Sequence, residues 1–224
     1  MPNAATSTLR AATNKLQTAV DRQIPLAGEL PGELLNRQVA GSGLDAALRV
    51  GVRPTLRDQL ATGGPTLLAF LRDFGCIFCR EMIKDIRVAS ETADAAGGPR
   101  RFPRVVFVHQ ASVESGERFF GRYWPGVPAI SDPDKHLYEA VGLGRGSVLQ
   151  LLGPRVWVSG VRALVKGHVP GTKRDGDKWT MPGLLLIDPP ADDEAPAVVR
   201  WSHRFRHAAD SPDFTTIANE KPAA

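Results

Sequence analysis

The sequence predicts an α/β fold with a central sheet, on three observations. Strand-like and helix-like patterns alternate over residues 65–123, which implies parallel strands joined by helical crossovers. Residues 65–71 are nearly all apolar and lie between glycines and a polar Arg-Asp pair, as in a strand covered on both faces. The chain has 224 residues, of which 42% are hydrophobic, enough for one sizeable core.

The chain before the first strong strand is expected to be helical. Residues 8–22 carry apolar side chains at helical spacing, and residues 33–38 are expected to form a short turn of helix. Residues 54–60 begin with proline, have leucines four apart and end before a Gly-Gly pair, which predicts a short helix. We therefore divide the chain into a helical N-terminal extension, residues 1–53, and an α/β domain, residues 54–224.

The α/β domain is expected to continue through further strands and helices. Helices are expected at 76–96, 113–123, 134–141 and 212–219, and strands at 104–109, 127–131, 183–188 and 198–203. A helical stretch at 147–166 and a polar Gly-rich loop at 167–178 separate the two halves of this series. No repeat or low-complexity segment interrupts it.

Composition and charge exclude several classes of protein. Lys and Arg total 28 against 24 Asp and Glu, a formal charge of +4 that is too small to indicate nucleic acid or an anionic membrane. The longest apolar run is far shorter than the roughly 18 to 20 residues that cross a bilayer. Two cysteines are too few for a secreted disulfide framework, and residues 1–20 lack a signal-peptide pattern. We expect a cytoplasmic protein that binds neither nucleic acid nor membrane.

Both cysteines belong to one Cys-x-x-Cys motif, Cys76 and Cys79, at the expected start of a helix. A helix start has backbone N–H groups without partners and the positive end of the dipole, and Arg72 and Arg80 add positive charge, so a thiolate is favoured there. The short spacing lets the two sulfurs meet and close a disulfide. The motif therefore favours redox chemistry, in which one cysteine attacks and the other resolves.

Other interpretations of these residues stay open. Two buried, inert thiols are one alternative, and a zinc site is another, because His203 and His207 lie four residues apart and could complete a Cys2His2 set. Against zinc, most of the domain separates the two pairs. His109, at the end of a strand, is a candidate acid or base, although a structural histidine is the commoner case.

The stretch at residues 70–81, Phe-Leu-Arg-Asp-Phe-Gly-Cys-Ile-Phe-Cys-Arg-Glu, resembles peroxiredoxin-like proteins of the alkyl hydroperoxide reductase and thiol-specific antioxidant superfamily, which includes selenoprotein-L-like redox proteins. The Val-Val-Phe-Val strand at 105–108, the Ser-Asp-Pro turn at 131–133 and a Met-Pro pair before the strand at 183–188 come in the order expected of that family. The resemblance covers residues 54–219. It implies a thioredoxin-like fold, with a central mixed β-sheet and helices on both faces.

The resemblance also implies roles for individual residues. Cys76 and Cys79 become the catalytic redox pair, and Pro182 is expected in cis beside the sulfurs. Peroxiredoxins place the peroxide-reactive cysteine where Cys79 stands, with a threonine at the place of Cys76, whereas thioredoxins attack with the first cysteine. The candidate substrate-binding residues around the pair are Arg72, Phe74, Arg80, Met181 and Pro182.

Together these observations predict a thiol–disulfide redox protein of peroxiredoxin-like type, with peroxide reduction among the activities that the resemblance implies. The oxidant is expected to be a peroxide or a protein disulfide, and the reductant a thioredoxin- or glutathione-type thiol. We expect no cofactor and no metal, and a homodimer is compatible with the sequence. The alternative is a non-enzymatic thioredoxin-like binding module whose cysteines are inert or hold zinc.

Overall fold

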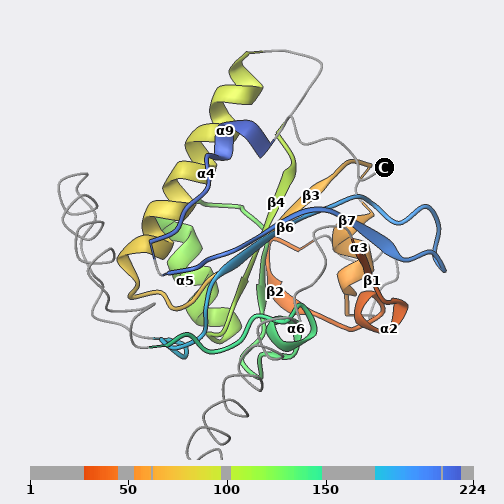
Figure 1. The fold of residues 1–224 in the computed structure, drawn as a ribbon, viewed down its shortest axis with the longest axis horizontal. Helices are drawn as coiled ribbons and strands as arrows, with labels where there is room; N and C mark the ends of the chain where they lie inside the picture. The colour runs from red at the N-terminus through yellow and green to blue at the C-terminus, as the bar shows by residue number, and fades with distance from the viewer. Residues whose placement is uncertain are drawn as a thin grey trace, which may run out of the picture.

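The computed structural model describes residues 28–44, 53–61, 63–96, 102–147, 175–207 and 209–217. Its centre is a seven-stranded sheet in the order β1-β7-β6-β3-β4-β5-β2 (Figure 1). The strands are β1 (Gly28–Leu30), β2 (Ala40–Ser42), β3 (Thr66–Phe70), β4 (Arg104–His109), β5 (Ala129–Ser131), β6 (Gly183–Ile187) and β7 (Ala197–Arg204). The expected helix at 8–22 and nearly all of the stretch at 147–174 lie outside the described residues.

The sheet is mixed, as the resemblance implied. β3 is parallel to β4, and β4 is parallel to β5, which confirms the helical crossovers expected from the alternating pattern. β6 runs antiparallel to β3 on its other side, and β7 runs antiparallel to β6. Phe70, the last residue of β3, therefore lies between Val108 and Gly183.

Helices cover both faces of the sheet, and alternate residues of the buried strands point to each face. Leu67 and Ala69 of β3 belong to a core with α4, α5 and α9, whereas Leu68 and Phe70 belong to a core with α2, α3 and α6 (Figure 1). Because both faces are covered, β3 and β6 are buried along their whole length. The helices are α2 (Gly32–Leu35), α3 (Leu56–Leu60), α4 (Ile77–Ala95), α5 (Val113–Tyr123), α6 (His136–Ala140) and α9 (Phe214–Ile217).

Side-chain caps explain where several helices begin. The Thr55 hydroxyl and the Asp58 carboxylate form a reciprocal capping box at the start of α3. The Ser112 hydroxyl accepts a hydrogen bond from the backbone N–H of Ser115 at the start of α5. α6 has no such cap on the residue before it, and instead the buried Asp132 carboxylate accepts from the backbone N–H groups of its first residues, over 3.0 Å for His136.

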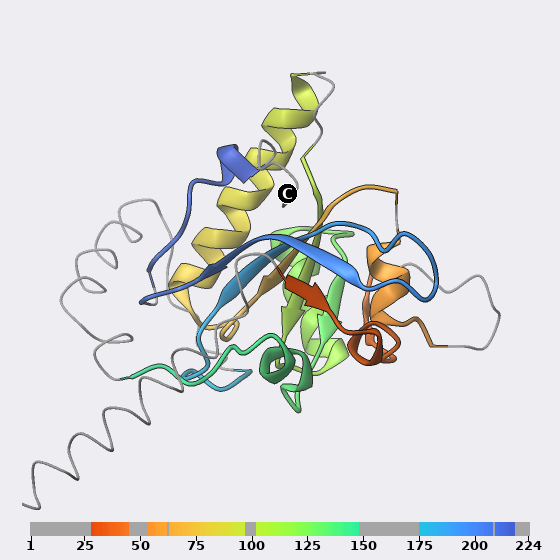
Figure 2. The same cartoon turned by 45° about the vertical axis from the view of Figure 1, so that its right-hand side comes forward.

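Residues 28–42 correct part of the expected helical extension. β1 pairs with β7 and β2 pairs with β5, so the two short strands close opposite edges of the same sheet (Figure 2). Residues 32–35 are helical, but the helical expectation is wrong for β1 and β2, whose partners lie far away in the sequence. The division of the chain at residue 53 otherwise stays a prediction.

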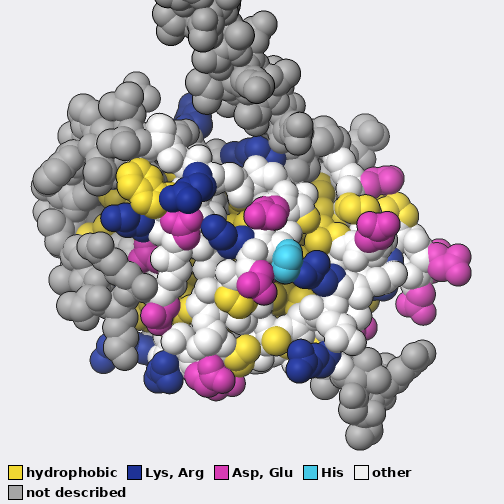
Figure 3. Space-filling model, turned by 90° about the horizontal axis from the view of Figure 1, so that it is seen from below, with side chains coloured by type: hydrophobic (Ala, Val, Ile, Leu, Met, Phe, Trp, Pro, Cys, Tyr) yellow, Lys and Arg dark blue, Asp and Glu magenta, His cyan; other side chains and the backbone are white. Residues whose placement is uncertain are grey.

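The surface carries charges of both signs. On the face shown in Figure 3, Lys and Arg side chains alternate with Asp and Glu among the described residues. Among the described helices, none has the length and apolar character needed to cross a membrane. The expectation that the protein binds no nucleic acid stays a prediction.

Candidate active site

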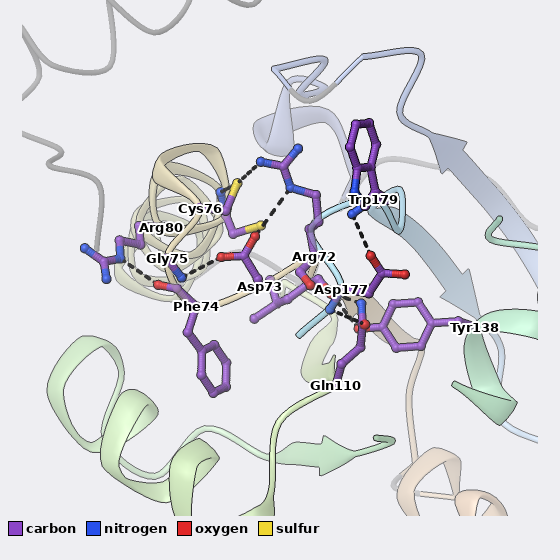
Figure 4. A network of polar contacts seen from close by, with 12 residues as sticks. Arg72, Asp73, Phe74, Gly75, Cys76, Arg80, Gln110, Tyr138, Asp177 and Trp179 are labelled. Carbon is purple, nitrogen blue, oxygen red and sulfur yellow. Dashed lines mark hydrogen bonds and ion pairs between the residues drawn. The ribbon is translucent and has the colours of Figure 1, made fainter. Parts of the chain in front are cut away.

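The Cys-x-x-Cys motif lies at the carboxyl edge of the central parallel strands, between the end of β3 and the start of α4 (Figure 4). Cys76 is the N-cap residue of α4, and its Sγ accepts a hydrogen bond from the backbone N–H of Cys79 over 3.4 Å. β4 ends at the same edge, so side chains of several elements converge there. The predicted placement of the motif at a helix start is confirmed.

A tight turn delivers Cys76 to the helix. The Asp73 carboxylate accepts from the backbone N–H of Gly75 over 2.7 Å, and the Asp73 carbonyl accepts from the N–H of Cys76 over 3.3 Å. This Asx-type turn reverses the chain directly after β3. Asp73 is buried, and its second carboxylate oxygen lies 3.7 Å from Nε of Arg72.

Arg72 directs its guanidinium at the first sulfur. Its Nη2 donates to Sγ of Cys76 over 3.3 Å (Figure 4). Only 13% of the Arg72 side chain is exposed, so water screens the pair weakly. A hydrogen bond from a cation stabilises a thiolate more than a thiol, and the contact therefore favours the ionised form of Cys76.

The two cysteines differ in acidity. The pKa of Cys76 is lowered from 9.0 to about 7 because the Cys79 thiol donates to its sulfur and Arg72 lies beside it, and these effects outweigh burial. The pKa of Cys79 is raised well above its usual value, since it donates its proton to Cys76 and is buried. Near neutral pH the arrangement therefore favours ionisation of Cys76, whereas Cys79 keeps its proton.

Two of the predicted substrate-binding residues point away from the sulfurs. Phe74 is buried, with its ring stacked on Phe119 at a centroid distance of 4.0 Å. Arg80 donates to the Phe74 carbonyl over 3.0 Å and lies over the ring of Tyr123, on the side of the helix start opposite Arg72 (Figure 4). In this arrangement both residues brace α4 against α5, and a direct contact with substrate stays a prediction.

The Met181-Pro182 pair enters β6 at the same edge of the sheet. Met181 is buried in the core cluster that contains both cysteines, and its N–H donates to Gly144 over 3.0 Å. The expected cis bond before Pro182 is wrong, because the described residues contain no cis peptide bond. Trans is the favoured isomer of an X-Pro bond by about 0.5 to 1 kcal/mol, and the flanking backbone is fully engaged around it.

His109 ends β4 behind the motif. It is 2% exposed, lies 5.1 Å from the ring of Phe74, and neither ring nitrogen has a hydrogen-bond partner among the described residues. Burial lowers its pKa to about 4, so the ring is neutral at physiological pH. The observations favour a structural histidine over an acid or base.

Three polar residues that the sequence did not single out, Tyr138, Gln110 and Asp177, take part in hydrogen bonds that fix the loop after β3. Tyr138 donates its hydroxyl to the carbonyl of Leu71, and Gln110 bridges the chain between Arg72 and Asp177 (Figure 4). The only sequence signal for Gln110 is its position directly after a strand at the carboxyl edge. Tyr138 and Asp177 carry no such signal.

The zinc alternative finds no support in the described residues. These residues contain no group of three or more His, Cys, Asp or Glu side chains placed to hold one metal ion. The ring of His203 is engaged elsewhere, 3.1 Å from the carbonyl of Asp210. Within the described ranges, Cys76 and Cys79 therefore lack the further ligands that a tetrahedral site requires.

The sequence also matches a known family. Residues 86–207, more than half of the chain, match the model of the family described as AhpC/TSA antioxidant enzyme. The protein belongs to the AhpC/TSA family. The matched segment begins inside α4, after both cysteines, so the family match itself does not include the Cys-x-x-Cys motif.

Individual proteins also resemble this chain. A prostamide/prostaglandin F synthase of Xenopus tropicalis is 31% identical over 125 residues, which cover 54% of this chain and 59% of that protein, less than two thirds of its length. The bacterioferritin comigratory protein of Xanthomonas campestris is 18% identical, with a TM-score of 0.50 over 85% of this chain and 89% of that one. Peroxidoxin BcpB of Mycobacterium tuberculosis is 17% identical, with a TM-score of 0.40 over 86% and 87%.

Within the AhpC/TSA family the fold is thioredoxin-like, as the sequence predicted. The mixed sheet and its two helical layers follow that pattern.

Proposed function

We propose that the protein is a two-cysteine thiol peroxidase in which Cys76 attacks the peroxide and Cys79 resolves the product. The observation that carries this proposal is the contact between Nη2 of Arg72 and Sγ of Cys76 at the start of α4. A thiolate is the nucleophile in attack on an O–O bond, and this contact favours the thiolate at neutral pH.

The proposed reaction has two chemical steps. The Cys76 thiolate attacks one oxygen of ROOH, the O–O bond breaks, and RO⁻ leaves and takes a proton from water to give ROH. Cys76 is then a sulfenic acid. The Cys79 sulfur attacks the Cys76 sulfur, the S–O bond breaks, and the hydroxyl leaves as water with the Cys79 proton, which yields a disulfide.

The geometry supports Cys76 rather than Cys79 as the attacking residue. Cys79 is 2% exposed and its pKa is raised, whereas Cys76 carries the lowered pKa and receives the guanidinium. This assignment follows the thioredoxin order of attack and differs from the peroxiredoxin order. Nε of Arg72 lies 3.7 Å from the Asp73 carboxylate, so the guanidinium is held between that carboxylate and the Cys76 sulfur.

A second substrate closes the cycle. Two thiols, from a thioredoxin-type dithiol or from glutathione, reduce the Cys76–Cys79 disulfide by exchange and leave as a disulfide themselves. A protein disulfide could replace the peroxide as oxidant, since the same thiolate attacks it. No bound cofactor enters either half-reaction. The proposal also includes a cytoplasmic location and a homodimer.

The proposal is tested with hydrogen peroxide and three forms of the protein: wild type, Cys76→Ser and Cys79→Ser. Each reduced form receives one equivalent of peroxide, and intact mass and peptide mapping follow the products. We expect a Cys76–Cys79 disulfide in the wild type, a sulfenic acid on Cys76 in Cys79→Ser, and slow oxidation at the rate of an ordinary thiol in Cys76→Ser.

Other outcomes discriminate between the alternatives. A sulfenic acid on Cys79 in Cys76→Ser, formed as fast as in the wild type, would assign attack to the second cysteine. Slow oxidation of all three forms would rule out the proposed peroxidase activity. If a disulfide-bonded protein substrate also failed to oxidise the pair, the binding module with inert cysteines would remain.

A further inference from the structure

The loop that carries Arg72 is held through its carbonyl groups. Four consecutive carbonyls each accept a hydrogen bond from a different donor, and no two donors come from the same residue. The acceptors and donors are Leu71 with the Tyr138 hydroxyl, Arg72 with the Gln110 amide, Asp73 with the Cys76 backbone N–H, and Phe74 with the Arg80 side chain. The loop therefore has a fixed path although it lies in neither a helix nor a strand.

Gln110 differs from the other donors because it joins two separate segments. Its Nε2 donates to the carbonyl of Arg72 over 3.0 Å, and its Oε1 accepts from the backbone N–H of Asp177 over 2.9 Å (Figure 4). The side chain is 8% exposed, so neither contact exchanges freely with water. One partner can only accept and the other can only donate, which fixes the orientation of the amide.

The segment at 175–180 packs directly against the Arg72 loop. Gly176 has φ +141°, and a Cβ built there would lie 3.0 Å from the carbonyl oxygen of Arg72. The carboxylate of Asp177 accepts from the N–H of Trp179 over 3.0 Å and pairs with Nζ of Lys135 over 3.3 Å. Asp177 thus fixes the segment through its own turn and through Lys135, the residue before α6. Gln110 links the segment to the loop that carries Arg72.

We propose that Gln110 is a positioning residue, which fixes the backbone of Arg72 against the segment at 175–180 and thereby sets the guanidinium on the sulfur of Cys76. Because the Arg72 side chain is long, a small rotation of its backbone moves the guanidinium away from the sulfur of Cys76. Gln110 touches neither sulfur and has no place in the bond-making steps. Its consequence for peroxide reduction rests on the proposed function, but its effect on Cys76 does not.

The structure offers reasons to expect a specific effect rather than a general loss of stability. Without the Gln110 amide, the part-buried carbonyl of Arg72 loses the donor that it has in the structure, so the backbone at Arg72 is expected to turn toward water. The carbonyls on either side keep their own donors, Tyr138 and the Cys76 N–H, so the fold of the loop is retained. The change is therefore expected to move mainly the backbone of Arg72, and its side chain with it.

The test measures the rate of Cys76 alkylation by iodoacetamide against pH, with the site of reaction read by peptide mapping. The variants are Gln110→Met, which keeps the volume, and Gln110→Asn, which keeps the amide but shortens the reach. We expect the rate at pH 6.5 to fall about 3- to 10-fold in both, while the limiting rate at high pH is unchanged, since only the thiolate fraction falls.

Gln59→Met is the matched control. Gln59 is also a buried glutamine, and its Oε1 accepts a hydrogen bond from Nη2 of Arg104 over 3.4 Å. It lies on α3, which covers the face of the sheet opposite the motif. This variant is expected to lower the melting temperature without changing the pH profile of Cys76. A Gln110 variant that is folded by circular dichroism and has the wild-type profile would overturn the proposal.

The outcome is independent of the peroxidase assignment. If the wild type reduces no peroxide, the pH profile of Cys76 still shows whether Gln110 positions Arg72. If the wild type reduces peroxide and the Gln110 variants keep the wild-type profile, the proposed function stands and the positioning role fails. Gln110→Asn keeps the test informative where the apolar methionine prevents folding.

Discussion

Nη2 of Arg72 donates a hydrogen bond to Sγ of Cys76 over 3.3 Å, and this contact joins the loop after β3 to the first residue before α4. The two residues are four apart in the sequence, and the Asx-type turn at Asp73 brings them together. The pKa of Cys76 is lowered chiefly by the hydrogen bond from the Cys79 thiol, and the nearby positive charge of Arg72 lowers it further.

Replacing Arg72 tests the source of the acidity. We expect Arg72→Met to raise the pKa of Cys76 from about 7 toward that of an ordinary thiol, because the hydrogen bond and the positive charge are both lost. The alkylation rate of Cys76 at pH 7 should fall about tenfold. Arg80→Met is the matched control, since Arg80 lies on the other side of the helix start and donates to the carbonyl of Phe74. Equal effects of the two substitutions would contradict the specific role of Arg72.

Two glycines of α5 provide a test of packing behind the site. A Cβ on Gly116 would lie 2.5 Å from Nε2 of His109, which is confined among aromatic rings, whereas a Cβ on Gly121 meets nothing within 4 Å. We expect Gly116→Ala to lower the free energy of unfolding by about 1 to 3 kcal/mol. Gly121→Ala should raise it by up to about 1 kcal/mol through helix propensity.

Urea denaturation of the two variants distinguishes these effects. The same substitution on the same helix is expected to have opposite signs, which separates packing from helix propensity. In the His109→Ala background, Gly116→Ala should cost much less free energy of unfolding, since the ring that a Cβ at position 116 would meet is gone. If Gly116→Ala proved as stable as Gly121→Ala, His109 would not lie against α5 as described.

His109 also predicts a pH dependence of stability. Its pKa is about 4 in the folded protein against 6.5 for an exposed histidine, because burial disfavours the charged ring. Between these values the unfolded state binds the proton and the folded state does not, so the free energy of unfolding falls as the pH falls from about 6.5 to about 4. At about 1.4 kcal/mol for each pH unit, the loss is about 3.5 kcal/mol at most.

The pH dependence is checked by urea denaturation at several pH values for the wild type and His109→Leu. The leucine variant cannot take up the proton, so its stability should vary less over the same range. The comparison removes the contributions that other titrating groups make in both proteins. Equal slopes in the two proteins would show that His109 does not resist protonation when folded.

The sequence predicted the elements whose signals are local. The strand at Arg104–His109 and the helix at Val113–Tyr123 have the predicted bounds, because each carries its own apolar period and polar ends. The motif at the start of α4 was found for the same reason. β1 and β2 were missed, since each has three residues and is defined by pairing with β7 or β5, which lie far along the chain.

The site was predicted only in part, for a related reason. Cys76, Cys79 and Arg72 share one short stretch, so the sequence places them together. Gln110 acts through the Arg72 carbonyl and the Asp177 N–H, and these contacts depend on how the strands associate. The prediction of a cis bond before Pro182 was wrong, because it was inferred from the family resemblance alone.

The central claim is that Cys76 is the thiolate and Cys79 the thiol at neutral pH. The most direct measurement is the alkylation rate of each cysteine in the reduced wild-type protein from pH 5 to pH 10, with each site quantified by peptide mapping. We expect Cys76 to react with a half-maximal rate near pH 7 and Cys79 to stay largely unmodified across the neutral range. Faster reaction of Cys79, or a common midpoint near the pKa of an ordinary thiol, would contradict this account.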